Sequence, residues 1–255
     1  MKVLLGPYNN DTRTVEIQID KYDTYSVDHT LSLIIVPLLI QLRDTNHGYP
    51  SNLNEKSLNF LFKLGVPILK IPSVEIKNYE FLEKFSKVNV PIILSTGTAS
   101  EQEIDVAFNL LKKKNDKIIL LQCTSSYPSK FNEIDLNVIK SFQKKYNCIV
   151  GFSGHEPGIN VAIAAAALGA KVIEKHFTDT CEREGPDHKF SMDPKSWKEM
   201  VNRSRELESS LGTGVKKVEE NEKETVILQR RALRATKNLL AGDEIKKEDF
   251  FPLRP

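Results

Sequence analysis

Short apolar runs alternate with amphipathic segments over much of this chain, from about residue 51 to residue 211. The apolar runs are rich in isoleucine, valine and leucine and are too short for helices, whereas the segments between them carry apolar residues at helical spacing. The predicted strands span residues 66–71, 91–95, 117–123, 148–152 and 171–176, and the predicted helices span residues 79–88, 101–114, 135–146, 157–169 and 194–210. A regular alternation of this kind is typical of a parallel sheet covered by helices.

The N-terminal region follows a different pattern. Residues 9–28 are polar with partial alternation, as in the segment TVEIQID, which predicts an exposed strand or hairpin. The most hydrophobic window, Ser32–Leu42, holds about eleven residues, well short of the ~20 that span a bilayer, and Pro37 interrupts it. We therefore predict a buried segment there, as a strand or a helix, rather than a membrane anchor. Residues 54–64 predict one further amphipathic helix.

Polar side chains gather where the predicted strands end. Consecutive parallel strands joined by right-handed crossovers point the same way, so side chains at their carboxyl ends converge on one mouth of the sheet. His155 and His176 lie at two successive strand ends, with Glu156 and Glu174 nearby. Two neutral imidazoles beside carboxylates suit an open divalent metal site that water or substrate completes. The alternative is that His155 caps the following helix and that His176 is a buried, satisfied histidine.

Two further strand ends carry residues suited to anions. Lys70 lies within a buried strand, where an unpaired charge is costly, so we expect it to meet a phosphate or a carboxylate. The alternative is an edge lysine whose ammonium group reaches water. Ser95 and Gly97 precede a helix that Ser100 and Glu103 are predicted to begin with a capping box. Such a loop offers N–H groups and hydroxyls to an anion, although an ordinary helix cap has the same residues.

Composition narrows the class of protein. The chain has 255 residues, enough for one barrel-sized domain, and its 36 basic and 34 acidic residues are nearly balanced. Charge therefore gives no case for binding to nucleic acid or to a membrane surface. The 3 cysteines form no CxxC pair, which favours reduced thiols in a cytosolic protein. The start of the chain does not predict a signal peptide, because its apolar run is very short.

Three motifs, GFSGHE, ALGAKVIEKHF and GPDHKFS, resemble those of the sialic acid synthase family, whose members condense phosphoenolpyruvate with amino sugars to form nonulosonic acids. The SGHE form, with Gly154 where bacterial SDHT versions have aspartate, and the segment LQCTSSYP are most similar to the animal N-acetylneuraminate or 9-phosphate synthases. The resemblance implies a (β/α)8 TIM barrel that is incomplete at its N-terminal side. It divides the chain into a divergent segment 1–50, the last five βα units in 51–211, a linker 212–227 and a partial SAF (antifreeze-like) domain 228–255.

The resemblance also implies roles for single residues. His155 and His176 would bind a divalent ion, Mn²⁺ with Mg²⁺ as the alternative, and Glu174 would be a third catalytic residue. The residues implied to hold phosphoenolpyruvate are Lys70, Ser73, Ser95, Ser125 and Ser153. Tyr127, Asp187 and Glu174 would orient the sugar, N-acetylmannosamine or its 6-phosphate. The position of Arg254 is that of a family arginine that enters the active site of a partner subunit, which implies a homodimer.

The first fifty residues depart from the family pattern. They contain neither the AEIGxNHxG motif nor the KFQ motif, which supply an acidic residue and a phosphate-binding lysine, and the segment NHG at 46–48 only echoes the former. Three further units do not fit there, because each βαβ unit needs ~30 residues. We therefore expect a truncated or rearranged cytoplasmic synthase. The alternatives are a synthase for another nonulosonic acid and a catalytically inactive fragment.

Overall fold

The structure is a computed structural model that describes residues 3–9, 14–19, 22–25 and 68–254. The chain divides into two compact units, Met1–Leu211 and Gly212–Pro255. The predicted helix over residues 54–64, the window Ser32–Leu42 and the segment 46–48 lie outside the described residues.

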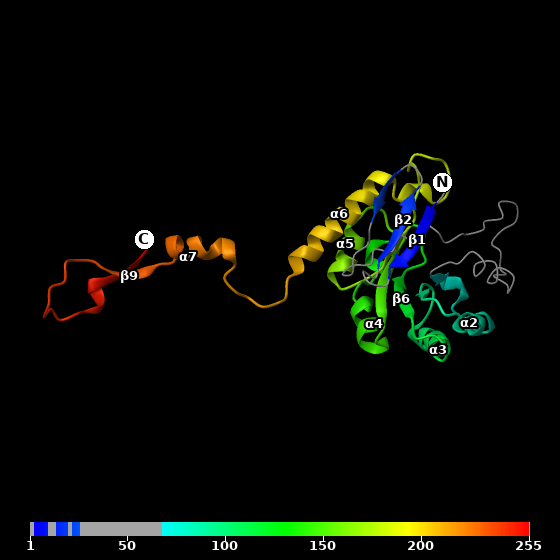
Figure 1. Ribbon diagram of the computed structural model, residues 1–255, viewed down its shortest axis with the longest axis horizontal. Helices are drawn as coiled ribbons and strands as arrows, with labels where there is room; N and C mark the ends of the chain where they lie inside the picture. The colour runs from blue at the N-terminus through cyan, green and yellow to red at the C-terminus, as the bar shows by residue number, and fades with distance from the viewer. Residues whose placement is uncertain (1–2, 10–13, 20–21, 26–67, 255) are drawn as a thin grey trace. The chain divides into compact units, whose positions relative to one another are not determined.

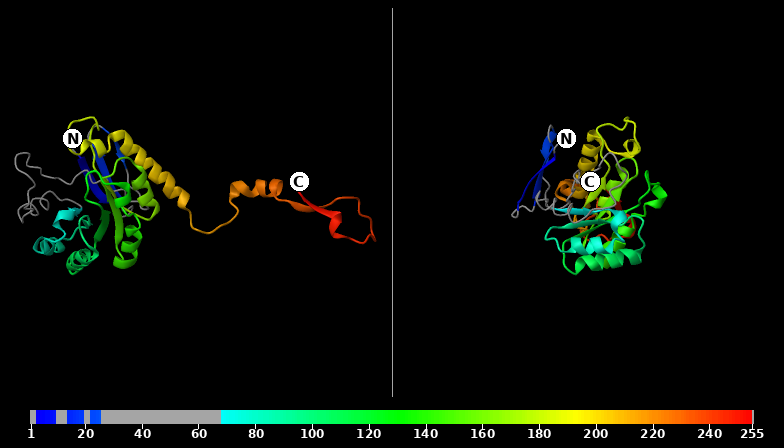
Figure 2. Two further views of the ribbon diagram at one scale, coloured as in Figure 1. Left: turned by 180° about the vertical axis from the view of Figure 1, so that it is seen from behind. Right: turned by 90° about the vertical axis from the view of Figure 1, so that its right-hand side faces the viewer.

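A five-stranded parallel sheet, in the order β4-β5-β6-β7-β8, forms the centre of the first unit (Figure 1). Its strands are β4 (Leu69–Ile71), β5 (Ile92–Ser95), β6 (Ile118–Cys123), β7 (Ile149–Gly154) and β8 (Ile173–Lys175). The accompanying helices are α2 (Tyr79–Ser86), α3 (Glu101–Lys112), α4 (Val138–Tyr146), α5 (Asn160–Ala167) and α6 (Pro194–Leu211) (Figures 1 and 2). Each strand lies beside the next one in the sequence, as in a barrel wall. The prediction of five βα units is confirmed.

Two helices begin later than predicted. The sequence pattern places their starts at residues 135 and 157, whereas α4 begins at Val138 and α5 at Asn160. Asp135 has a φ of 45° and Gly158 a φ of 79°, both in the left-handed region. A residue in that region cannot continue a right-handed helix, so each helix begins only beyond it.

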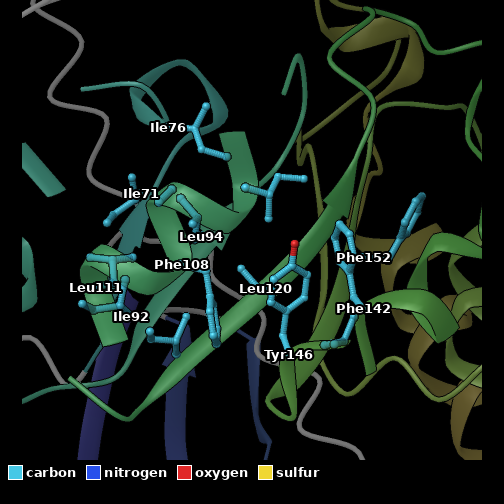
Figure 3. Close-up of a cluster of buried hydrophobic side chains, with 14 of the residues drawn as sticks. Ile71, Ile76, Ile92, Leu94, Phe108, Leu111, Leu120, Phe142, Tyr146 and Phe152 are labelled. Carbon is cyan, nitrogen blue, oxygen red and sulfur yellow. The ribbon is translucent and has the colours of Figure 1, made fainter. Parts of the chain in front are cut away.

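The two faces of the sheet differ in character. One face packs against the helices and forms the main core, which includes Ile92, Leu94 and Leu120 (Figure 3). The other face carries a small apolar cluster of Ile93, Ile119, Leu121 and Val172. Because strand side chains alternate between faces, the polar strand residues Lys70, Ser95, Ser153 and Glu174 lie on this second face, together with Cys123. The strand register brings Cys123, Ser153 and Glu174 into one row across three strands.

The described N-terminal segments form an antiparallel sheet of three strands in the order β1 (Val3–Asn9), β2 (Thr14–Ile19) and β3 (Tyr22–Tyr25). The prediction of a strand or hairpin around TVEIQID is confirmed. These three described strands pair with one another only in antiparallel fashion, so they are not strands of βα units.

The second unit contains a short helix, α7 (Lys223–Gln229), and two antiparallel strands, β9 (Ala232–Ala235) and β10 (Phe250–Leu253). Most of its side chains are exposed, whereas Asp249 is buried and pairs with Lys237 at 2.6 Å. The predicted linker 212–227 therefore differs from the structure, because its last residues belong to α7. The assignment of this unit to an SAF domain stays a prediction.

Two observations bear on the predicted environment of the chain. Cys123, Cys148 and Cys181 are all free thiols. Within the part of the chain that the structure describes, no helix combines the length and the apolar character needed to cross a bilayer.

Candidate active site at the carboxyl ends of the strands

The two predicted histidines lie together beyond β7 and β8. The ring centroids of His155 and His176 are 5.2 Å apart, with the rings nearly perpendicular at 80°. The Tyr127 ring lies 4.1 Å from that of His155 and 5.7 Å from that of His176, and Phe190 lies 5.3 Å from His176. The convergence predicted from strand order is thus confirmed, and two aromatic side chains border the imidazole pair.

His155 is held by a backbone carbonyl. Its side chain is largely buried, and its Nδ1 lies 2.8 Å from the carbonyl oxygen of Thr124. A carbonyl oxygen only accepts, so Nδ1 carries the proton and Nε2 keeps its lone pair. Burial lowers the pKa of His155 and so favours the neutral imidazole, although the hydrogen bond to Thr124 raises the pKa and opposes this shift. His155 does not cap the next helix, because α5 begins at Asn160 and its N-cap, Ile159, makes no side-chain capping bond.

His176 is more open than His155. Its side chain is 32% exposed, and its Nδ1 lies 3.7 Å from Oδ2 of Asp187, which is too long for a hydrogen bond. The alternative of a fully buried histidine is therefore wrong. A carboxylate beside the second nitrogen is a common arrangement around metal-binding histidines, because it orients the ring.

The donor set of this pair fits an open divalent site. Among the described residues, no group of three or more histidine, cysteine or acidic side chains converges as a metal cluster. The described part of the chain would supply two imidazoles, and other oxygen ligands, such as water or substrate, would complete the shell. Such a shell suits Mn²⁺ or Mg²⁺; the identity of the ion stays a prediction.

Lys70 meets an anion, as expected, and the anion is a side chain of the protein. Its Nζ lies 3.3 Å from Oε1 of Glu174, and the same oxygen accepts a 2.7 Å hydrogen bond from Ser153 Oγ. The lysine side chain is 5% exposed, so the alternative of an edge lysine that reaches water is wrong. The other carboxylate oxygen of Glu174 and the hydroxyl of Ser95 are buried without a hydrogen-bond partner in the described structure. Both atoms are available to a ligand of this mouth.

A second cluster of small polar side chains surrounds Gly97. Ser73 Oγ accepts a 2.9 Å hydrogen bond from the Gly97 N–H and lies 3.7 Å from Cys123 Sγ, which in turn lies 4.0 Å from Ser125 Oγ. A Cβ atom at position 97 would lie 2.1 Å from Ser125 Oγ, so any other residue here would force the Ser125 side chain to move. Ser73 and Ser125 are thus brought together as predicted. The sequence analysis missed Cys123, although its inward position on β6 was readable from the alternation of that strand.

Three more residues complete the comparison with the sequence. Asp187 contacts His176, while its neighbour His188 lies 2.8 Å from Thr178 Oγ1 and so braces the loop after β8. Glu156, expected among the carboxylates at the metal, has its carboxylate buried against Lys175 instead. Burial lowers the pKa of Lys175, and Glu156 opposes that shift. Arg254 follows β10 in the second unit, and its role at this site stays a prediction.

Comparisons with known proteins match the region that contains this site. The NeuB family model matches residues 49–216. The chain is 40% identical over 203 residues to N,N'-diacetyllegionaminic acid synthase of Campylobacter jejuni, which covers 78% of this chain and 61% of that protein. It is 37% identical to human N-acetylneuraminate-9-phosphate synthase over 66% of this chain and 47% of the human protein. The crystal structure of N-acetylneuraminic acid synthetase from Leptospira borgpetersenii, in complex with citrate, matches 68% of this chain and 61% of that chain, with 37% identity and a TM-score of 0.64.

These matches support the barrel assignment but not a particular sugar. The parallel sheet and its helices agree with an incomplete barrel of the family type. The chain spans about three fifths of the length of the bacterial relatives that it matches. The 40% identity to a legionaminic acid synthase is no lower than the 37% to the human enzyme, so the comparisons do not favour the animal form expected from SGHE.

Proposed function

Since this chain belongs to the NeuB family, we propose that its site serves a synthase that condenses phosphoenolpyruvate with N-acetylmannosamine or its 6-phosphate and releases phosphate. The products would be N-acetylneuraminate or its 9-phosphate. The second candidate is a synthase for another nonulosonic acid, which the similarity to legionaminic acid synthase favours. We also propose that the protein acts in the cytoplasm as a homodimer in which Arg254 enters the site of the partner subunit.

One observation carries the proposal: a pair of imidazoles and a lysine–carboxylate–hydroxyl chain lie at the carboxyl ends of the same parallel strands. In barrel enzymes this end holds the catalytic residues. A divalent ion at His155 and His176 would act as a Lewis acid on the open-chain sugar aldehyde. Tyr127 and Asp187, which border the imidazoles, would orient the sugar.

Phosphoenolpyruvate would bind next to the ion. Ser73, Ser95 and Ser125 would donate hydrogen bonds to its phosphate or carboxylate oxygens. Lys70 and Ser153 both contact Glu174 in this structure. When the anion binds, the ammonium group of Lys70 and the hydroxyl of Ser153 would turn toward it. Glu174 would then be free to receive a proton.

The reaction would form one carbon–carbon bond and break one ester bond. C3 of phosphoenolpyruvate would attack the aldehyde carbon, and water would add to the resulting cation at C2. Glu174 would take one proton of that water, which balances the proton that the aldehyde oxygen gains as it becomes a hydroxyl. The second water proton would leave with phosphate when the tetrahedral adduct collapses to the C2 carbonyl and the C2–O bond to phosphate breaks.

Phosphate release by the purified chain tests the proposal, with phosphoenolpyruvate, Mn²⁺ and either sugar. We expect phosphate release only when a sugar is present. In His155→Ala the rate should fall at least about a hundredfold, because the variant loses a direct metal ligand. His188→Gln is the matched control, because it removes an imidazole that braces the loop and leaves the pair intact. A folded chain that releases no phosphate with any sugar would be the inactive fragment that the N-terminal departure suggests.

A further inference from the structure

A buried ion pair joins the two strand ends that carry the imidazoles. Glu156 follows His155, and Lys175 precedes His176. The side chains are 0% and 1% exposed, respectively. Lys175 Nζ donates to Oε1 of Glu156 at 2.5 Å and also to the backbone carbonyl oxygen of Glu156. A single ammonium group thus holds both the side chain and the main chain of the neighbouring strand end.

Stability alone does not account for this pair. Desolvation of two charges usually offsets their attraction, and well-packed apolar residues in their place are often no less stable. Moreover, Oε2 of Glu156 is buried without a hydrogen-bond partner in the described structure, which adds to the cost. What the pair does supply is a fixed relative position of the two strand ends, because Lys175 Nζ must lie within hydrogen-bond distance of two oxygens of Glu156.

Gly154 makes room for the carboxylate. It ends β7 and lies opposite Lys175 in the strand register. A Cβ atom at position 154 would lie 2.5 Å from Oε2 of Glu156 and 2.6 Å from Cε1 of Phe152. The carboxylate of Glu156 therefore fills the space that a side chain at position 154 would need. The SDHT form has its carboxylate at that position and none two residues later, so each form carries one carboxylate at these two positions.

We propose that Glu156 and Lys175 form a clamp that sets the spacing of His155 and His176, and that position 154 is glycine because Glu156 supplies the carboxylate of the clamp. The two are positioning residues, since neither needs to touch a substrate. Each is directly bonded in sequence to one imidazole-bearing residue, so a shift of either strand end moves one imidazole relative to the other. Compared with the SDHT form, the carboxylate is thus moved from position 154 to position 156. This inference rests on the proposed function only in that it takes the imidazole pair as the reactive centre.

A carboxylate-swap series tests the clamp in the full chain. The variants are Gly154→Asp, Glu156→Thr, Lys175→Met and the double variant Gly154→Asp with Glu156→Thr. The first readout is the NMR spectrum of ¹⁵N-labelled histidine in metal-free protein, which reports the geometry of both imidazoles without any need for activity. The second is the affinity for Mn²⁺, from the electron paramagnetic resonance signal of the free ion.

We expect each single variant to move the resonances of both histidines and to weaken Mn²⁺ binding at least tenfold, the usual effect of losing an outer contact at a metal site. The double variant should return the resonances and the affinity to within about threefold of the original, because it offers Lys175 one carboxylate again. Asn115→Ala is the matched control. Asn115 is buried, and its side-chain amide donates to the carbonyl oxygens of Val88 and Val90, just before β5. Its loss should destabilise the sheet away from the imidazoles and leave the histidine spectrum unchanged.

Either readout can overturn the proposal. If folded Glu156→Thr and Lys175→Met chains keep both histidine resonances, the pair does not position the imidazoles. If the double variant is no better than the worse single variant, position 154 is not an alternative place for the carboxylate of the clamp. If a single variant fails to fold, the double variant decides, because a restored fold with the original histidine spectrum is expected only of a relocated carboxylate. If the original chain binds no Mn²⁺, the metal part of the proposed function fails, and the histidine spectra still decide the clamp.

Discussion

Lys70 places a positive charge inside the sheet, and Glu174 compensates it. In Lys70→Met the carboxylate keeps only its hydrogen bond from Ser153. We expect the free energy of unfolding to fall by about 2 kcal/mol, less than the 3–5 kcal/mol typical of fully buried pairs, because Glu174 is 18% exposed. Urea unfolding followed by the fluorescence of the single tryptophan, Trp197, measures the change.

The matched control for that change is Lys130→Met. Lys130 and Glu133 form an exposed pair, with side chains 76% and 45% exposed, so its loss should change stability by less than about 0.5 kcal/mol. Equal stability of the two variants would show that Glu174 does not depend on Lys70.

Gly97 is the second residue at which geometry predicts an outcome. In Gly97→Ala the new methyl group would meet Ser125 Oγ, so the serine must turn away from the cluster. We expect the affinity for inorganic phosphate, measured by calorimetry, to fall about tenfold, as the loss of one hydrogen bond to a charged group implies. Adding Ser125→Ala to Gly97→Ala should cost little more, because the displaced hydroxyl is already lost. Two independent, additive losses would contradict a shared cluster.

For single residues, the sequence predicted where side chains lie in the fold better than which side chains they contact. The proximity of His155 and His176 was predicted correctly because strand order alone brings successive strand ends together. The pairing of Lys70 with Glu174 joins the two outermost strands of the five-stranded sheet, so no local pattern reports it. Glu156 was misassigned because the residue after an inward-facing histidine points the other way, and its partner Lys175 lies on the next strand.

Among the helices, α3 shows how much local chemistry can predict. Its start was predicted from Ser100 and Glu103, and the structure has the complete capping box. The starts of α4 and α5 were missed because Asp135 and Gly158 adopt positive φ values. A capping box can be predicted from two residues that are close in the sequence. A left-handed backbone conformation depends on how the loop packs, which the local sequence does not determine.

The capping box of α3 predicts a dependence on pH. Hydrogen bonds from Lys77 first, and from Ser100 next, lower the pKa of Glu103 to about 2, from 4.5. A lowered folded-state pKa means that this contribution to stability is complete above pH 4.5 and is lost as pH falls toward 2. Glu103→Gln should therefore flatten the fall in urea midpoint between about pH 5 and about pH 3.

Glu80→Gln is the control for that measurement, since Glu80 contacts Lys84 on the exposed side of α2 without a capping role. If Glu80→Gln flattens the profile as much as Glu103→Gln, general surface charge, not the capping box, causes the acid dependence.

For the whole molecule, the βα units were predicted more fully than the N-terminal strands or the linker. The periodicity that indicates a parallel sheet runs from Leu69 to Leu211, where the first unit ends. The described N-terminal strands β1 to β3 are antiparallel, and the partial alternation in TVEIQID predicted a strand or hairpin there but not the number of strands. The linker was predicted from its charge, but charge does not exclude a helix, because lysine and glutamate are good helix formers.

The division into two units predicts where a protease cuts. Residues 212–219 are exposed and form no helix or strand, and Lys216 and Lys217 are 89% and 66% exposed. A protease needs several residues of extended chain, which secondary structure denies it. Within residues 68–254 we therefore expect trypsin to cut first after Lys216 or Lys217, as mass spectrometry of a digestion time course would show.

Arg183 is a competing site, because it is exposed in the loop after β8, but its guanidinium group is held by Asp179. Lys216→Gln with Lys217→Gln should slow the first cut at least tenfold, since local exposure governs the rate. An unchanged rate, or a first cut after Arg183, would mean that this loop opens more readily than the segment between the units.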